Sequence, residues 1–307
     1  MISAFLATLL FSASVVCANR AARCIGSIEA NFWRLLIATI ILAVWAHGSG
    51  KGLSGDGFLI FLLSGFIGFG LGDLALFQAL PRLGSRLTML LVHCLAAPFA
   101  AIIEWLWLGT ALSTGEILGG MTILAGVSLA LAPGSHPHQA TRDYIPGIFF
   151  GVLSALGQGS GAVLSRKAYE LTAQAGQSID GITAAYQRIL GGLVVAVVFF
   201  LFSKRRVIPE TESDQVDKTG SSSGQTWRLA GPWIFLNAVA GPVLGVSCFQ
   251  WALQMTPTGI VLPIVATAPL VVIPFSRAME QDQPGFRALA GSILAVVGVV
   301  TLVMLRQ

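Results

Sequence analysis

The chain has 307 residues, of which 55% are hydrophobic and only 10% are charged, and its mean hydropathy is +0.79. Soluble domains carry roughly 25% charged residues, so this composition excludes an ordinary soluble protein and predicts an integral membrane protein. The formal net charge of +4 is small. Because the basic residues lie between apolar runs, they indicate membrane topology rather than a nucleic-acid surface.

Apolar runs long enough to cross a membrane recur along the whole sequence. A membrane helix needs about 20 mostly apolar residues. By that measure the sequence predicts ten spans, at 2–19, 30–47, 57–80, 86–108, 115–132, 146–168, 183–203, 230–253, 258–276 and 286–305. The first run has no basic segment before it and no small-residue cleavage site after it, so we expect a retained span. The polar, Ser/Gly-rich segment 204–226 is expected to form a flexible loop.

The two halves of the chain resemble each other in sequence. Gly68–Leu80 (GFGLGDLALFQAL) is echoed by Gly241–Leu253 (GPVLGVSCFQWAL) at a spacing of 173, and the residues around Arg34 recur around Arg188 at a spacing of 154. We therefore expect a duplicated five-span unit. Its copies are predicted to occupy residues 1–133 and 146–307, joined by 134–145.

The number of spans in each copy fixes how the copies are oriented. Because five is odd, the second copy must enter the membrane from the opposite side. The sequence thus predicts an all-α integral membrane protein with ten transmembrane helices in two inverted five-helix repeats. Inverted repeats are typical of secondary transporters, whose binding sites lie near the midplane at the repeat interface.

This pattern resembles the EamA branch of the drug/metabolite transporter superfamily over nearly the whole chain. The points of similarity are an early Arg in the second span of each copy, a Gly-rich third span, a mid-span Pro in the fourth, and a Gly-rich fifth span; they are Arg34, Arg188, Pro98, Pro269 and the LAGV sequence at 124–127. The resemblance implies alternating-access export of amino acids, other metabolites or drugs. A Gly-Glu pair often closes the fourth span in this family. Here Gly109 is followed by Thr110, so no role is transferred to that acid.

The direction of insertion is left open because two indications disagree. The odd-numbered connections contain 12 Lys and Arg residues, whereas the even-numbered connections and the termini contain 4. The positive-inside rule therefore places both termini outside. The family resemblance implies that they lie inside.

Five ionisable residues lie within predicted spans and are candidates for gating or proton coupling: Arg34, Asp73, His93, Glu104 and Arg188. An ionisable residue inside a span costs about 2.5–3.5 kcal/mol on insertion scales, so each suggests a function. Counted along the helices, they predict two layers, with Arg34, Asp73 and His93 toward one surface and Glu104 and Arg188 toward the other. We expect Arg34–Asp73 and Arg188–Glu104 to be alternating gate pairs.

Simpler interpretations of these residues remain open at this point. Both arginines could extend to lipid headgroups. Glu104, which is followed by Trp105 and Trp107, could mark an interfacial helix end. His93 could be a hydrogen-bonded interior residue.

An uncharged polar layer is expected near the middle of the membrane. It brings together hydroxyl and amide side chains with prolines that free a backbone carbonyl one turn back. The predicted substrate-binding residues are Ser12, Ser14, Gln158, Ser160, Asn237, Pro98 and Pro269. Such a layer suits a small polar or zwitterionic solute.

The sequence favours a secondary-active transporter in the cell membrane that catalyses no reaction. It contains no G-x-S-x-G, H-E-x-x-H or P-loop motif, so we expect neither catalysis nor direct ATP drive. No cofactor is expected, and no metal, because His136 and His138 have no third ligand nearby. The expected partners are a small-molecule substrate and lipid, with no nucleic acid. Proton coupling and a homodimer are left open. The alternatives are an intramembrane enzyme and a non-transporting sensor or assembly component.

Overall fold

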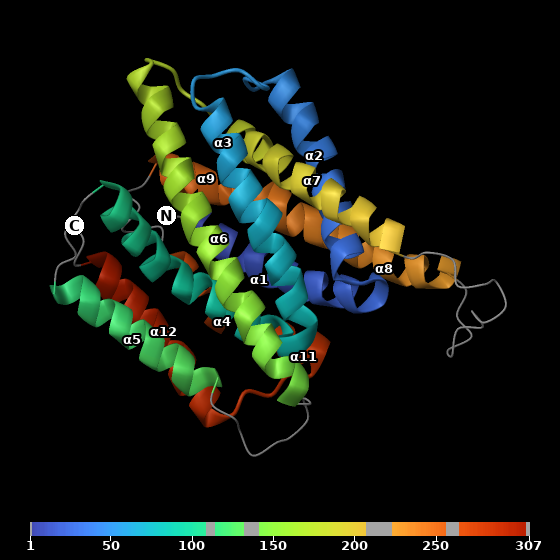
Figure 1. Ribbon diagram of the computed structural model, residues 1–307, viewed down its shortest axis with the longest axis vertical. Helices are drawn as coiled ribbons and strands as arrows, with labels where there is room; N and C mark the ends of the chain where they lie inside the picture. The colour runs from blue at the N-terminus through green and yellow to red at the C-terminus, as the bar shows by residue number, and fades with distance from the viewer. Residues whose placement is uncertain (1, 109–113, 132–140, 207–222, 256–263, 305–307) are drawn as a thin grey trace.

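The fold is known from a computed structural model, which describes residues 2–108, 114–131, 141–206, 223–255 and 264–304. Within these ranges every regular element is a helix (Figure 1). In chain order they are α1 (Ile2–Ile25), α2 (Ser27–Gly48), α3 (Phe58–Gly65), η1 (Phe66–Gly72), α4 (Asp73–Leu108), α5 (Thr114–Leu131), α6 (Thr141–Gln174), α7 (Gly181–Arg206), α8 (Ser223–Ala238), η2 (Val239–Gly245), α9 (Val246–Met255), α11 (Ala268–Glu280) and α12 (Phe286–Met304). The elements η1 and η2 are π-helical.

The protein is a multi-pass integral membrane protein. Six stretches of the described chain are long and apolar enough to cross a membrane, namely Ile2–Ile25, Ser27–Gly48, Phe58–Ile103, Asp143–Gln174, Gly181–Arg205 and Thr226–Ala252. Two shorter apolar helices, Ile117–Leu131 and Phe286–Thr301, accompany them. The predicted all-helical membrane class is therefore confirmed, whereas the number of ten spans and their inverted arrangement stay predictions.

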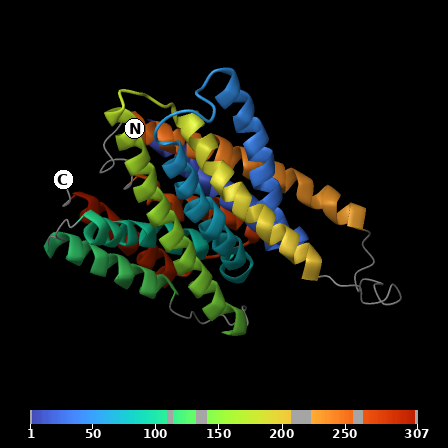
Figure 2. The same cartoon turned by 45° about the horizontal axis from the view of Figure 1, so that its top comes forward.

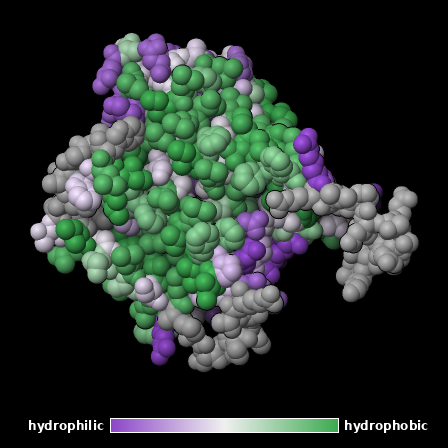
Figure 3. Space-filling view, in the orientation of Figure 1, coloured by the Kyte–Doolittle hydropathy of each residue, from purple (hydrophilic) through white to green (hydrophobic). Residues whose placement is uncertain are grey.

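The outer surface matches a lipid environment. Figure 3 shows an apolar face with hydrophilic residues gathered toward its margins. Large apolar side chains such as Leu59, Phe149 and Phe202 are exposed on the surface of the protein. Contiguous apolar surface on this scale is not stable in water, so it indicates contact with lipid.

The predicted spans 57–80 and 86–108 are joined more closely than expected. The chain runs from α3 through η1 into α4 without a separate loop, and α4 bends at Gly84. Gly84 has φ 77° and ψ 169°, outside the helical region. An L side chain rarely adopts that φ, so glycine allows two helices to meet at this point. The stretch Phe58–Ile103 consequently combines two predicted spans.

The two π-helical segments occupy equivalent places in the two halves of the chain. Each has 7 residues, and both boundaries of η2 follow those of η1 at the 173-residue spacing of the sequence repeat. A π-helix is rare and often marks a functional site, because its wider turn redirects the residues that follow. The repeat seen in the sequence therefore also appears in the backbone geometry, as a π-helical segment in each half.

Small residues let α5 and α12 pack closely. A methyl group placed on Gly126 would lie 2.3 Å from the backbone nitrogen of Ala295, and one on Gly291 would lie 2.5 Å from that of Ala130. Figures 1 and 2 show the two helices side by side along most of their lengths. In lipid no hydrophobic force drives helices together, so backbone contact of this kind holds them.

We expect Gly126→Ala to destabilise the protein, because the added methyl group must push α12 away. Overpacking of this kind typically costs about 1–3 kcal/mol. The matched control is Gly120→Ala on the same helix, where a methyl group would meet nothing within 4 Å. Thermal unfolding of both variants in detergent should lower the Tm for Gly126→Ala alone. An equal loss in both variants would contradict the packing argument.

Candidate substrate-binding site

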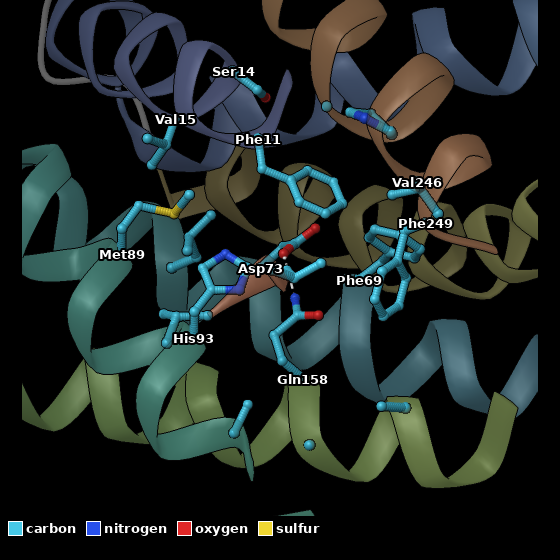
Figure 4. Close-up of a pocket in the computed structure, with 18 of the residues that line it drawn as sticks. Phe11, Ser14, Val15, Phe69, Asp73, Met89, His93, Gln158, Val246 and Phe249 are labelled. Atoms are coloured by element: carbon cyan, nitrogen blue, oxygen red, sulfur yellow. Dashed lines mark hydrogen bonds between the residues drawn. The ribbon is translucent and has the colours of Figure 1, made fainter. Parts of the chain in front are cut away.

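A buried pocket of about 180 Å³ lies in the middle of the helix bundle. It is lined from the first half of the chain by α1, α2, η1 and α4, and from the second half by α6, α7, α8, η2, α9 and α12. Most of the lining is apolar. Figure 4 shows Phe11, Phe69 and Phe249 around a central group that contains Asp73 and Gln158. This volume is below the ~300–1,000 Å³ typical of drug-sized ligands, so the observed state suits a small solute.

Asp73 is the anionic centre of the pocket. It is only 3% exposed, and its Oδ2 accepts a hydrogen bond within an ion pair with Nη2 of Arg34. Its Oδ1 accepts a 3.0 Å hydrogen bond from Nε2 of Gln158, which is visible in Figure 4. A buried ion pair remains tolerable only when further hydrogen bonds satisfy the remaining lone pairs. Gln158 fulfils that condition for the carboxylate.

Arg34 is held from three directions. Besides Asp73, its Nε donates to Oδ1 of Asn31 at 3.1 Å, and its guanidinium carbon lies 4.7 Å from the centre of the Phe77 ring. Cation–π contact and hydrogen bonding together orient the planar group. Arg34 therefore acts as a fixed partner of Asp73 rather than as a headgroup anchor.

Arg188, the repeat counterpart of Arg34, also lines the pocket, but no described carboxylate forms an ion pair with it. It is 4% exposed, and its Nε is buried without a hydrogen-bond partner. Its guanidinium carbon lies 5.1 Å from the centre of the Phe69 ring. Arg188 and Asp73 interact electrostatically. Arg34 is bonded to a carboxylate, whereas Arg188 contacts an aromatic face and interacts with Asp73 without a hydrogen bond.

Glycines place these groups at the pocket. A methyl group on Gly65 would lie 1.6 Å from the carbonyl oxygen of Arg188, so α3 touches the backbone of α7 there. A methyl group on Gly157 would lie 2.8 Å from Cα of Gly72, which brings α6 against η1 next to Gln158. These close approaches leave no room for side chains between the helices.

Four of the seven predicted substrate-binding residues are not part of the lining. Ser12 is buried, and its hydroxyl donates to the carbonyl oxygens of Thr8 at 2.8 Å and Ala268 at 3.4 Å. The Ser160 hydroxyl donates to the carbonyl oxygen of Leu156 on its own helix. Pro98 and Pro269 likewise lie outside the lining.

The remaining predicted polar residues do reach the pocket. Ser14, Gln158 and Asn237 all line it. The Ser14 hydroxyl donates to Oδ1 of Asn237 at 2.7 Å, which joins the first and second halves of the chain. Nδ2 of Asn237 is buried without a partner, so this amide retains a donor.

The predicted division of the charged residues into two layers stays a prediction, although residues from both layers meet at the pocket. Arg34, Asp73, His93 and Arg188 all line one pocket. Counting residues from span ends gives a position along one helix, whereas the pocket is formed by side chains from several helices. The side chain of Glu104 lies outside the described part of the structure, so its predicted pairing with Arg188 stays a prediction.

His93 faces the aromatic side of the pocket. Its ring stacks on Phe11 with the centroids 6.0 Å apart and the planes inclined by 27°. Asp73, which would be its partner in an acid–base pair, is bonded to Arg34 and Gln158. The described residues contain no group of three or more His, Cys, Asp or Glu side chains that could hold a metal ion.

The apolar half of the pocket was not predicted from the sequence. Phe11, Phe69, Met89, Pro242 and Phe249 line it, but each is indistinguishable in sequence from an ordinary lipid-facing or core residue. The repeat offers one signal that could have found two of them. Phe69 and Pro242 are counterparts at the 173-residue spacing, within the two π-helical segments.

A second polar cluster joins α1, α4 and α11 beyond the pocket. Nδ2 of Asn19 donates to Oε1 of Glu280 at 2.7 Å, and the backbone N–H of Ser85 donates to Oε2 of the same carboxylate at 3.2 Å. Arg86 and Asp282 form an adjacent ion pair at 2.7 Å. Ser85 lies one turn before Met89 of the lining, so these contacts fasten three helices together next to the pocket.

An all-helical chain with several apolar spans and a charged internal pocket is a polytopic membrane protein with a binding cavity. The sequence profile of the EamA-like transporter family matches residues 1–132 and 145–304. The chain therefore belongs to the EamA-like transporter family. No curated protein matches it in sequence. A solved structure, described only as the crystal structure of a protein, aligns with a TM-score of 0.62 at 16% identity and covers 99% of this chain and 95% of its own. That similarity supports the fold alone.

The ion pair should dominate the energetics of the pocket. We expect Asp73→Leu or Arg34→Met alone to lower the free energy of unfolding by about 3–5 kcal/mol, because each leaves a buried charge unpaired. The double variant Arg34→Met/Asp73→Leu should lose much less than the sum of the two. Unfolding in detergent measures all three variants. Additive losses would show that the two side chains are not energetically coupled.

Proposed function

We propose that this protein is a secondary-active transporter that moves a small metabolite by alternating access. The observation that carries the proposal is the shared origin of the pocket. Its lining contains counterparts from both copies of the repeat: Arg34 with Arg188, Phe69 with Pro242, Asp73 with Val246, and Leu76 with Phe249. A site formed between inverted repeats can open to either side when the repeats exchange conformations.

The proposed substrate class is amino acids or related solutes, and the proposed direction is export across the cell membrane. The apolar lining favours a solute with a hydrophobic part, and Ser14, Gln158 and Asn237 supply polar partners. An intramembrane enzyme is the less favoured alternative, because Asp73, the carboxylate that could pair with His93, is bonded to Arg34 and Gln158. Uptake by proteoliposomes separates the transporter from both an enzyme and a non-transporting sensor.

We further propose that Asp73 carries a coupled proton and that its pairing with Arg34 contributes to gating. Asp73 has no acidic counterpart, because Val246 occupies its place in the second repeat. Proton binding to a carboxylate releases its paired arginine, which would link protonation to movement of α2 against α4. Burial favours the neutral acid and the nearby arginine opposes it, so the balance can change between states.

Asp73→Asn tests this coupling. The amide keeps the shape, and its single oxygen can accept a hydrogen bond from Arg34 while its NH2 group donates to the rotated amide of Gln158, but it cannot bind or release a proton. We expect substrate movement driven by a pH gradient to be abolished in proteoliposomes, while exchange of substrate down its own gradient persists.

The matched control for that experiment is Asp143→Asn, at an exposed position near the start of α6. It should transport like the unmodified protein. If Asp73→Asn retains full pH-driven transport, Asp73 has no part in coupling.

Variants at Gln158 and Ser12 test whether the substrate binds in the pocket. We expect Gln158→Leu to weaken substrate binding, because a lost partner for a buried polar group typically costs about 1–3 kcal/mol. Ser12→Ala should leave affinity unchanged, since the Ser12 hydroxyl is satisfied by backbone carbonyls outside the lining. Binding is measured by isothermal titration, with the Tm of each variant recorded alongside. A loss confined to Ser12→Ala would place the site elsewhere.

A further inference from the structure

Arg188 is the one described arginine of the pocket that has no carboxylate bonded to it. Arg34 has Asp73 as its ion-pair partner. Arg188 contacts the Phe69 ring, and its buried Nε has no hydrogen-bond partner. An isolated buried charge is costly unless it is paired and hydrogen-bonded. Among the described residues none forms a hydrogen bond with the Nε of Arg188, so the pocket leaves this cation available to a ligand.

The charge of the pocket points in the same direction. Arg34 and Asp73 offset each other, which leaves the single positive charge of Arg188. Among the described lining residues, His93 is the remaining titratable side chain, and protonation of an imidazole can only add positive charge. The hydroxyl of Tyr169, which lies within electrostatic reach of Arg188, is also buried without a partner. A singly charged anion would balance the site.

We propose that the pocket binds a small monocarboxylate, with its carboxylate on the guanidinium of Arg188 and its apolar part against the Phe11, Phe69 and Phe249 side of the cavity. The planar fork of an arginine matches a carboxylate through two parallel N–H···O bonds. The apolar lining favours a hydrocarbon or aromatic body over a second charged group. This substrate class rests on the proposed transport function.

The arrangement also explains why one repeat carries an acid and the other does not. Asp73 satisfies Arg34 from within the chain, whereas Val246, its counterpart, leaves Arg188 available. The substrate would supply the carboxylate that the second repeat lacks. The difference between the two arginines thus provides substrate recognition in a structure that is otherwise repeated.

The test is direct binding to the purified full chain in a neutral detergent, measured by isothermal titration and by the shift in Tm. The ligands form matched sets on aliphatic and aromatic bodies: the amino acid, the acid without the amino group, and the amide and methyl ester of each. We expect the acids without an amino group to bind and their amides and esters to bind at least about tenfold more weakly, because charge-assisted bonds to Arg188 are lost. The amino acids should bind less tightly than the matching acids, since the ammonium adds the second charge that the apolar lining disfavours. Equal binding of amides or esters would overturn the proposal, as would failure of every carboxylate to bind.

Variants locate the interaction. Arg188→Gln should weaken carboxylate binding by about 10- to 100-fold, and Arg188→Lys should fall between it and the unmodified protein because the charge remains without the fork. Arg287→Gln is the matched control at an exposed position on α12 and should bind normally. Should Arg188→Gln fail to fold, the comparison of acids with esters on the unmodified protein decides the matter. Unchanged carboxylate affinity in a folded Arg188→Gln would overturn the assignment.

Failure of this proposal and failure of the transport function are distinguishable. Carboxylate binding that depends on Arg188, without uptake into proteoliposomes, would support the site and contradict transport. Uptake of solutes without a carboxylate, unaffected by Arg188→Gln, would support transport and overturn the carboxylate site.

Discussion

Moving a guanidinium and a carboxylate from water into an apolar helix bundle costs several kcal/mol per ion, and only close pairing with further hydrogen bonds offsets that cost. The Arg34–Asp73 pair meets this demand through Asn31 on one side and Gln158 on the other. These contacts tie α2, α4 and α6 to one point. The helices that surround the pocket are thus positioned by the need to keep two charges satisfied, and the cavity forms where their apolar side chains do not meet.

Close helix packing is the second constraint, and it comes from the solvent. Lipid is as apolar as a leucine side chain, so helices associate through close backbone contact rather than through hydrophobic burial. Glycines provide that contact where α7 meets α3, where α6 meets η1, and where α5 meets α12. The first two contacts set the positions of Arg188 and Gln158. The same residues that hold the bundle together therefore determine the geometry of the pocket.

The duplicated frame contains an asymmetric centre. The π-helical segments, the paired arginines and the small-residue contacts recur in both halves, but the acid occurs once. The repeated elements therefore surround a site that is chemically different in its two halves. In the observed state Asp73 is bonded to Arg34 and interacts with Arg188 only electrostatically. The site thus has one satisfied and one available cation.

The sequence by itself determined the class of protein, because composition and apolar run length depend only on transfer of side chains and backbone into lipid. It also determined the duplication, since the 173-residue echo is visible without coordinates and recurs in the π-helical boundaries. It singled out Arg34, Asp73, Gln158 and Arg188 because polar groups inside apolar runs are rare. These conclusions use local properties of the chain.

Only the tertiary structure decided how these residues combine. Counting along helices assigned Arg188 and Arg34 to different layers, whereas both line one pocket, and glycine contacts bring the backbone of Arg188 against α3. Ser12 and Ser160 looked equivalent to Ser14 and Gln158 in sequence, but their rotation about the helix axis turns their hydroxyls onto backbone carbonyls. The aromatic lining could not be predicted from the sequence. A phenylalanine such as Phe11 or Phe249 contributes equally to an apolar run whether it faces lipid, the protein core or a cavity. The depth of a residue in the bundle and the direction of its side chain depend on how the helices cross. The crossing is set by contacts between residues far apart in the chain.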